Sequence, residues 1–379
     1  MSELRICKKC LMLSTRPRLQ FNENGVCSAC QWAEEKRTIV NWDKRQEELK
    51  SLCDKYRRKD GYFDVIVPVS GGKDSSTVAH KLKTKYGMHP LCININHAPS
   101  TDTGLNNINM HNFINNGFDT IRIYPNPKVV QKLDKAGLVK YGQPYFGWMY
   151  AMTIAPIKMA IMFNIPFVMY GEEGEVEYGG STELKNVATY SIEHVKRLYL
   201  SGISLEDIDE AVGEDESLWW WQAPTEDEID RIKPAVAHWS YFENWNSEAN
   251  YKYAKEYVGL KEAKVDSSGT YNNYAQTDSI QYPLHVYFMY LKFGFGRCSQ
   301  DACIDIRTGS ITREEGIKLV EEYDEVYPEM FEDQYLAYYD MTREEWNANI
   351  DRWANKELLY KDPINGRWKK KFTEIYHKD

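Results

Sequence analysis

The sequence lacks any apolar run long enough to cross a membrane. A membrane-spanning helix needs roughly 20 consecutive apolar residues, and no run in the 379 residues approaches that length. The first ten residues, MSELRICKKC, also lack the apolar core of a signal peptide. These absences predict a cytoplasmic protein without a membrane segment. In that reducing compartment, the eight cysteines are expected to bind metal or to stay free thiols rather than to form disulfides.

The chain also lacks the excess of positive charge that is typical of proteins that wrap nucleic acid. Its net charge is −9, which argues against a nucleic-acid partner. Only residues 1–60 are basic, with 14 Lys and Arg against 9 Asp and Glu, an excess of +5 that leaves −14 for the remainder. We interpret this modest excess as ordinary solvated surface. With 42% hydrophobic residues, the chain has the material for a sizeable core and more than one domain.

Half of the cysteines form two tight pairs near the N-terminus. These are Cys7, Cys10, Cys27 and Cys30, in a C-x2-C-x16-C-x2-C pattern that lies in the zinc-ribbon range. Asn24-Gly25 between the pairs predicts a hairpin turn. Two such pairs complete a closed tetrahedral site, so we expect structural Zn²⁺. An iron–sulfur cluster and a redox dithiol pair are the alternatives.

A glycine turn connects an expected strand over 62–69 with an expected helix over 74–86. Its residues are Ser70, Gly71, Gly72, Lys73, Asp74 and Ser75. Glycines allow the backbone to approach a ligand closely, and the amides at a helix start bind phosphate. The stretch lacks the Walker spacing and resembles the PP-loop of ATP pyrophosphatases, which cleave ATP to AMP and pyrophosphate. The simpler alternative is a turn that only caps a helix.

Alternating elements follow this loop. Strands are expected over 89–95, 119–124 and 166–170, and helices over 103–117, from 127, and over 146–164, where Pro156 is expected to kink or split the helix. The alternation predicts an α/β fold with a largely parallel sheet. In such sheets the ligand lies beyond the carboxyl ends of the strands. Asn96, at one such end, is therefore expected beside the adenine and ribose.

The fourth strand ends in an acidic loop, residues 171–180 (GEEGEVEYGG), with four glutamates and four glycines. Gly171 is expected to allow close approach of the nucleotide, and Glu172 and Glu177 are the candidate catalytic carboxylates. Carboxylates there suit Mg²⁺ on the pyrophosphate or a base toward an incoming amine. A solvated acidic loop is the alternative.

Further basic residues lie near the C-terminal end of the expected nucleotide domain. Lys292, Arg297 and Arg307 are candidates for binding acidic groups of a substrate, whereas Cys298 and Cys303 are expected to be free thiols. We divide the chain into a zinc ribbon (1–33), a linker helix (34–60), the nucleotide domain (61–310) and a helical C-terminal region (311–379). The nucleotide domain contains an acidic insertion near 205–230 whose Trp219-Trp220-Trp221 are expected to pack inward, with a sugar or partner platform as the alternative. Thr312 and Glu315 predict a capping box at the start of a helix.

Seven segments together resemble the N-acetyl sugar amidotransferase family, which includes the pseudaminic acid and lipopolysaccharide biosynthesis amidotransferases. They are CKKCLM at 7–12, TRP at 15–17, NGVCSAC at 24–30, VPVSGGKDS at 67–75, YGE at 170–172, EYG at 177–179 and KFGFGR at 292–297. The resemblance covers almost the whole chain. The cysteine pairs and the PP-loop fit several families, whereas the YGE, EYG and KFGFGR segments make the match specific.

The resemblance implies conversion of an N-acetyl group on a nucleotide-linked or acidic sugar to an acetamidino group. It implies that ATP adenylates the amide oxygen, with the PP-loop on the pyrophosphate, Lys73 neutralising charge, and Asp74 with Glu172 on Mg²⁺. Relatives draw ammonia from a separate glutaminase complex that resembles the histidine-biosynthesis pair, so a similar partner is expected. A PP-loop tRNA thiolation enzyme and a non-catalytic ATP-binding subunit remain the alternatives.

Overall fold

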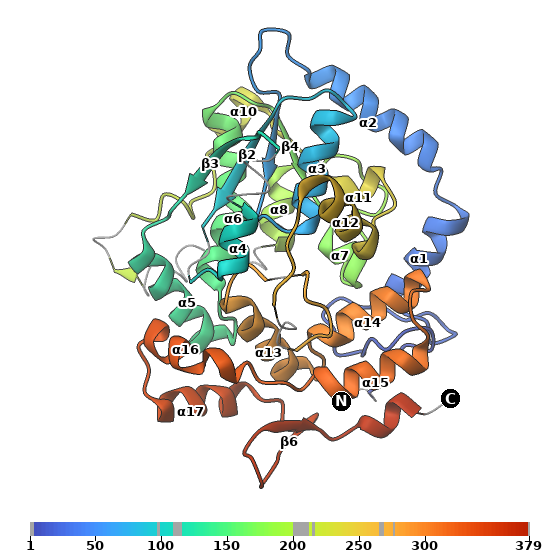
Figure 1. Ribbon diagram of the computed structural model, residues 1–379, viewed down its shortest axis with the longest axis vertical. Coiled ribbons are helices and arrows are strands. Elements are labelled where there is room, and N and C mark those ends of the chain that lie inside the picture. Colours follow the sequence, from blue (N-terminus) through green and yellow to red (C-terminus); the bar gives the residue numbers. More distant parts are fainter. Residues whose placement is uncertain are drawn as a thin grey trace.

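A five-stranded parallel sheet, in the order β3-β2-β1-β4-β5, forms the centre of the computed structural model (Figure 1). The structure describes residues 4–96, 99–108, 116–199, 212–213, 217–264, 269–275 and 277–377. The sheet domain contains β1 (Val65–Pro68), α3 (Lys73–Thr84), β2 (Pro90–Ile95), α4 (Asp102–Asn106), β3 (Asp119–Ile123), α5 (Pro127–Tyr141), α6 (Phe146–Met162), β4 (Phe167–Tyr170), α7 (Gly174–Tyr178), α8 (Ile192–Tyr199), α10 (Glu226–Ile232), β5 (Ala235–His238), α11 (Trp239–Phe242), α12 (Ser247–Tyr253) and η2 (Ala254–Val258).

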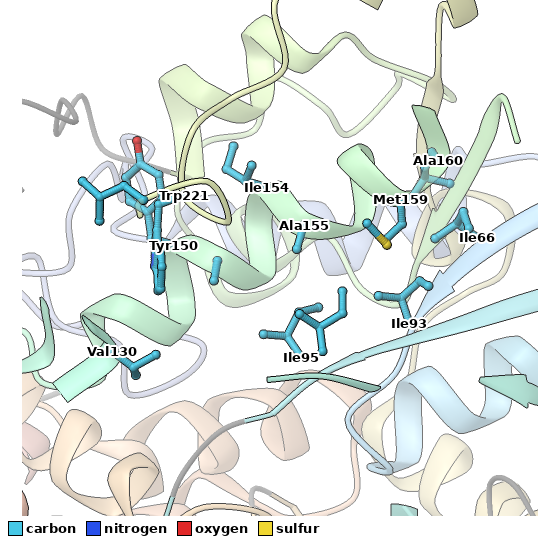
Figure 2. Close-up of a cluster of buried hydrophobic side chains, with 14 of the residues drawn as sticks. Ile66, Ile93, Ile95, Val130, Tyr150, Ile154, Ala155, Met159, Ala160 and Trp221 are labelled. Carbon is cyan, nitrogen blue, oxygen red and sulfur yellow. The ribbon is translucent and has the colours of Figure 1, made fainter. Parts of the chain in front are cut away.

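The sheet has a hydrophobic core on each face, because successive strand side chains point to opposite sides. Ile66, Ile93 and Ile95 pack against α6 on one face, where Figure 2 shows them beneath Ile154 and Met159. The intervening strand residues, such as Val65, Val67, Cys92 and Met169, pack with α2, α3 and α11 on the other face. Both faces are therefore covered, as the α/β prediction requires.

The flanking regions form two further cores, and one of them includes Leu138 of α5. Before it come α1 (Ser28–Thr38) and α2 (Trp42–Tyr56); after it come α13 (Gln281–Phe293), α14 (Arg297–Thr308), α15 (Arg313–Tyr323), η3 (Glu329–Phe331), α16 (Glu332–Tyr339), α17 (Arg343–Trp353), the hairpin β6 (Leu359–Lys361) and β7 (Trp368–Lys370), and η4 (Thr373–His377). The four N-terminal cysteines share one core with α14 and α15 (Figure 1). A second core joins α13, α16, α17 and the hairpin. No helix in the described part of the chain has the length and apolar character to cross a membrane.

Several elements differ from the expectations. The helix α6 continues through Pro156. The segment expected as one linker helix is the end of α1 followed by the separate helix α2, so the division at 33/34 falls inside α1. The helix expected over 103–117 is described only as α4, because 109–115 lie outside the described residues. The strand β5 and the hairpin of the C-terminal region had no strong alternating pattern and were missed. In the insertion near 205–230, residues 212–213 and 217–230 are described. Trp221 is fully buried and donates its indole N–H to the Gly147 carbonyl at 2.8 Å, whereas Trp219 is 38% exposed.

Candidate active site

The PP-loop forms a tight turn between β1 and α3. Gly72 is the N-cap residue of α3, and Gly71 has φ +92° with its Cα closely packed against the backbone of Ile108. An added Cβ there would lie 3.0 Å from the Ile108 nitrogen, so only glycine fits. The Ser70 hydroxyl accepts a hydrogen bond from the Gly72 amide at 3.2 Å. The loop therefore has the backbone geometry expected for a phosphate-binding turn at a helix start.

A main cavity of about 250 Å³ opens above this loop. All six PP-loop residues line it, together with Gly171, Glu172 and Arg297. The rest of the lining is mostly aromatic and polar, with three small or aliphatic residues: Gly104, Asn107, Tyr145, Trp148, Tyr178, Leu260, Tyr274, Ala275, Thr277, Asp278 and Tyr282. The structure thus brings together the PP-loop, the start of the acidic loop and the arginine of the KFGFGR segment.

Asp74 is held firmly at the floor of the main cavity. Its Oδ1 accepts hydrogen bonds from Trp245 Nε1 at 2.9 Å and Asn250 Nδ2 at 2.7 Å. Its Oδ2 pairs with the ammonium group of Lys73. These two donors could not be predicted from the sequence. Trp245 precedes α12 and Asn250 lies on it, and nothing in their local pattern indicates that they face the PP-loop.

Glu172 is the glutamate of the acidic loop that lines the main cavity. Burial, together with repulsion from Asp74, raises the pKa of Glu172 to about 7, although Lys73 and Arg297 act in the opposite direction. No residue in the described ranges forms an ion pair with it. A carboxyl group that titrates near neutral pH beside a phosphate-binding loop is suited to accept a proton.

The other three glutamates of the acidic loop make structural contacts, as a helix cap or in ion pairs. Glu173 caps α7 by accepting the Val176 amide at 2.6 Å. Glu175 forms a bidentate ion pair with Arg18, at 2.8 and 2.5 Å. Glu177 pairs with Lys36 at 2.6 Å and accepts the Trp32 indole N–H at 3.2 Å. Glu177, predicted as a catalytic carboxylate, therefore faces α1 and does not line the main cavity.

Arg297 reaches the main cavity from the start of α14. Its guanidinium forms an ion pair with Asp301 at 2.7 Å and donates to the Tyr282 hydroxyl at 3.2 Å. Although burial opposes the charge, Asp301 raises the pKa of Arg297 further above its usual value. Gly296 fits only because it lacks a Cβ, which would lie 2.9 Å from the Asp324 carbonyl oxygen. The KFGFGR segment thus delivers a permanent positive charge to the cavity.

The remaining predicted binding residues lie elsewhere. Lys292 donates to the Tyr141 carbonyl at 3.3 Å, and burial lowers the pKa of Lys292 to about 8. Arg307 donates to the Glu177 carbonyl at 3.1 Å and approaches Cys10 Sγ at 3.9 Å. Asn96 Oδ1 lies 3.5 Å from the Arg122 guanidinium. None of these three lines the main cavity.

An aromatic pair at the start of α6 lines the main cavity, whereas Asn96 does not. The rings of Tyr145 and Trp148 stack with centroids 4.5 Å apart and an interplanar angle of 8°. Trp148 Nε1 donates to the Ile95 carbonyl at 3.0 Å. Tyr145 has φ +69°, a conformation that is uncommon for a residue with a side chain. This rigid pair offers a flat surface on which a planar ring can stack, and the sequence contained only a weak signal for it in Tyr145–Trp148.

The four-cysteine site brings Cys7, Cys10, Cys27 and Cys30 together, all buried, with their Sγ atoms within 4.8 Å of one another. The Sγ atoms of Cys7 and Cys30 are 3.8 Å apart, and those of Cys10 and Cys27 are 3.7 Å apart. Four thiolates at about 2.3 Å from one tetrahedral ion lie about 3.8 Å from each other. A [4Fe–4S] cluster binds each thiolate to a different iron and needs wider spacing. The residues therefore fit a single tetrahedral ion, and the Cys27 amide at 3.3 Å from Cys7 Sγ supports a thiolate there.

The two cysteines of α14 have no role in the main cavity. Cys298 and Cys303 are both fully buried, and neither lines the cavity. Cys303 Sγ accepts the Leu11 amide at 3.3 Å, so it packs directly beside the four-cysteine site. Burial raises the pKa of both thiols. These properties agree with inert core thiols.

Comparisons with known proteins connect part of the chain to surface polysaccharide synthesis. Residues 268–373 match the family described as the LPS biosynthesis protein WbpG-like C-terminal domain. No protein with a curated function matches the sequence. Among solved structures, the U34-tRNA thiolase NcsA from Methanococcus maripaludis with its [4Fe-4S] cluster shares 13% identity over 86% of this chain and 90% of its own, with a TM-score of 0.25. The matched C-terminal segment includes Arg297 and the KFGFGR segment, which agrees with the resemblance to sugar-modifying enzymes.

Proposed function

We propose that the protein is an ATP-dependent amidotransferase that converts the N-acetyl group of a nucleotide-linked or acidic sugar to an acetamidino group. The observation that carries the proposal is the main cavity, where the PP-loop, Glu172 and Arg297 meet. The WbpG-like match supports a sugar substrate in lipopolysaccharide synthesis. The PP-loop supports the use of ATP.

In the proposed reaction, ATP first adenylates the amide oxygen, because an amide oxygen by itself is a poor leaving group. The amide oxygen attacks the α-phosphorus of ATP, the bond to the β-phosphate breaks, and pyrophosphate leaves. The nitrogen of ammonia then bonds to the imidate carbon, and AMP departs with the electron pair of the carbon–oxygen bond. One proton of ammonia is lost to a base, while the original amide nitrogen keeps its proton.

Each residue of the main cavity takes one task in this proposal. The amides and hydroxyls of the PP-loop bind pyrophosphate, and Lys73 neutralises the charge that develops as it leaves. Glu172, with its pKa near 7, accepts the proton from the attacking ammonia. Arg297 binds an acidic group of the sugar substrate. The Tyr145–Trp148 pair provides the stacking surface for the adenine ring.

Two metal ions fit the residues that are present. Asp74 lines the main cavity beside the PP-loop, and its carboxylate offers the oxygen ligands that Mg²⁺ prefers. Asp74 would hold Mg²⁺, which neutralises the charge of the pyrophosphate when bound. The four-cysteine site would hold structural Zn²⁺. Ammonia would come from a glutaminase complex that resembles the histidine-biosynthesis pair.

The test is pyrophosphate release in the presence of ATP, magnesium chloride and ammonium chloride. The acceptors are UDP-N-acetylglucosamine, its uronic acid and N-acetylneuraminic acid, with the corresponding non-acetylated sugars as matched controls. We expect release that requires both an acetamido sugar and ammonia. Release that depends on tRNA instead would contradict the proposal and favour a thiolation enzyme, although no cysteine lines the main cavity among the described residues. Absence of release with every acceptor would favour a non-catalytic subunit.

A further inference from the structure

Tyr178 is the last residue of α7 and the central residue of the EYG segment, and both of its neighbours are held in place. On one side, the Glu177 carboxylate is paired with Lys36 of α1 at 2.6 Å. On the other side, Gly179 ends the helix with φ +92°, and a Cβ added to it would lie 2.9 Å from Leu19 Cδ1. A residue with a side chain would be strained at this position. The backbone on both sides of Tyr178 is therefore fixed.

The side chain of Tyr178 lines the main cavity together with Glu172, Asp74 and Arg297. Trp245 contacts the Tyr178 ring edge to face, with ring centroids 5.8 Å apart. The Trp245 indole N–H in turn donates to Asp74 at 2.9 Å. The Tyr178 ring therefore packs against a side chain that is itself bonded to the PP-loop.

The hydroxyl of Tyr178 forms no hydrogen bond with any residue in the described part of the chain. By contrast, the Tyr282 hydroxyl in the same cavity accepts a hydrogen bond from Arg297 at 3.2 Å. Burial, together with the negative charge of Glu172, raises the pKa of Tyr178 well above its usual value, so the hydroxyl keeps its proton at neutral pH. A protonated phenol in a cavity, without a partner in the protein, is a hydrogen-bond donor that is available to a ligand.

The reacting atoms of the proposed reaction must lie close to this hydroxyl. The PP-loop binds the pyrophosphate at one end of the reacting system, and Arg297 binds the acidic group of the sugar at the other. The charged groups that act most strongly on the Tyr178 hydroxyl are Glu172, Arg297 and Asp74. The hydroxyl therefore lies among the proposed base and the residues at both ends, where the bond between the imidate carbon and the oxygen of AMP must break.

We propose that Tyr178 is a catalytic residue whose hydroxyl donates a hydrogen bond to the oxygen that leaves the imidate carbon with AMP. This inference rests on the proposed amidotransferase function. In this step the nitrogen of ammonia bonds to the carbon, the carbon–oxygen bond breaks, and its electron pair stays on the departing oxygen. The hydrogen bond stabilises the charge that develops there. Tyr178 keeps its proton, and Glu172 takes the proton that ammonia releases.

The same donor does not assist the first step of the reaction. In that step the amide oxygen is the nucleophile, and a hydrogen bond to it withdraws electron density that the attack on the α-phosphorus needs. The proposal therefore separates the two steps: removal of the donor should slow the departure of AMP and should not slow adenylation.

Tyr178→Phe tests this separation, because it removes the donor and keeps the ring that contacts Trp245. Two rates are measured with ATP, magnesium chloride and the acetamido sugar that supports turnover. Exchange of labelled pyrophosphate into ATP without ammonia reports adenylation, and amidine formation with ammonium chloride reports the whole reaction. We expect amidine formation to fall about a hundredfold, while pyrophosphate exchange and the KM for ATP stay within about twofold.

Tyr170→Phe is the matched control. Tyr170 comes directly before the acidic loop, and its hydroxyl also has no hydrogen-bond partner among the described residues. This hydroxyl is buried, however, and Tyr170 does not line the main cavity. We expect Tyr170→Phe to leave both rates unchanged, and denaturant titration shows whether each variant is folded.

Three results would overturn the role of Tyr178. They are an unchanged rate of amidine formation in Tyr178→Phe, a parallel fall in its pyrophosphate exchange, and an equal loss of amidine formation in Tyr170→Phe. Failure of the unsubstituted protein to form an amidine would instead contradict the proposed reaction, and this is seen before any variant is compared.

Discussion

Glu172 and Glu177 belong to the same acidic loop, but they face opposite sides of it. Glu172 lines the main cavity with a pKa raised to about 7. Glu177 is buried against α1, where Lys36 and Trp32 bind its carboxylate. One side of the loop therefore carries the proposed base, and the other fastens the loop to α1 and the region of the four-cysteine site. The region of the four-cysteine site therefore supports the main cavity, because it holds the loop that carries Glu172 and Tyr178.

Removal of the metal should have the largest effect, because it should unfold the region that holds the acidic loop in place. The four cysteines lie in the core shared with α14 and α15, and Arg307 links Cys10 to the Glu177 carbonyl. Without an ion, four buried thiols lose their common partner, so we expect chelation to unfold residues 4–33 first and then to expose the acidic loop. Hydrogen exchange followed by mass spectrometry measures both regions. Zinc analysis of protein purified without chelator is the control. Absence of zinc from that protein would refute the assignment of the four-cysteine site to Zn²⁺.

Lys73→Ala should abolish turnover while leaving the packing of the acidic loop against α1 intact. Loss of a charge that neutralises the leaving pyrophosphate is expected to lower kcat about a thousandfold. Asp74→Ala should have a similar effect. Lys85→Ala, at the exposed end of α3, is the matched control. Substantial amidination by either cavity variant, with an unchanged circular dichroism spectrum, would contradict the assigned roles.

The two glutamates themselves give the sharpest contrast. We expect Glu172→Gln to lower kcat about a hundredfold, with little change in the free energy of unfolding. Glu177→Gln leaves Lys36 without a carboxylate and should lower the free energy of unfolding by about 2 kcal/mol, with a smaller loss of kcat. Denaturant titration and pyrophosphate release separate the two quantities. Equal losses of kcat would remove the distinction between the two sides of the loop.

The pH dependence of the rate should reflect the ionisation of the Glu172 carboxyl group. Its carboxyl group must be ionised to accept a proton, and its pKa is raised to about 7. The rate at constant free ammonia should therefore fall as the pH drops below about 7 and level off above it. In Glu172→Gln this inflection should disappear. An unchanged inflection in that variant would assign the titration to another group.

The smallest expected effect on stability concerns the partly exposed ion pair between Arg18 and Glu175. Arg18 pairs with Glu175 at a partly exposed position, with side-chain exposures of 44% and 16%. Arg18→Gln should lower the free energy of unfolding by about 1 kcal/mol or less. Arg197→Gln, which removes the exposed pair with Glu183, should have no measurable effect. A larger loss for Arg197→Gln than for Arg18→Gln would show that the acidic loop is not fastened through Glu175.

The sequence allowed prediction of features that depend on neighbouring residues. The cysteine pairs, the PP-loop between β1 and α3, and the acidic loop after β4 all follow from local spacing. The direction of each glutamate could not be predicted, because Glu172 precedes α7 whereas Glu177 lies on it, and the position of α1 decides that Glu177 is buried. Similarly, Trp245 and Asn250 reach Asp74 only through the tertiary fold. Arg307 and Lys292 were chosen for their charge, and only the structure shows that neither lines the main cavity.

The proposed conversion of an amide to an amidine changes the mass of the sugar, so the mass of the product is the most direct test. The protein is incubated with ATP, magnesium chloride, ammonium chloride and the acetamido sugars, and the sugars are then analysed by mass spectrometry. We expect a product in which the mass of one oxygen is replaced by that of an NH group, together with one AMP per product. Formation of AMP and pyrophosphate without any change in the mass of the sugar would contradict the claim.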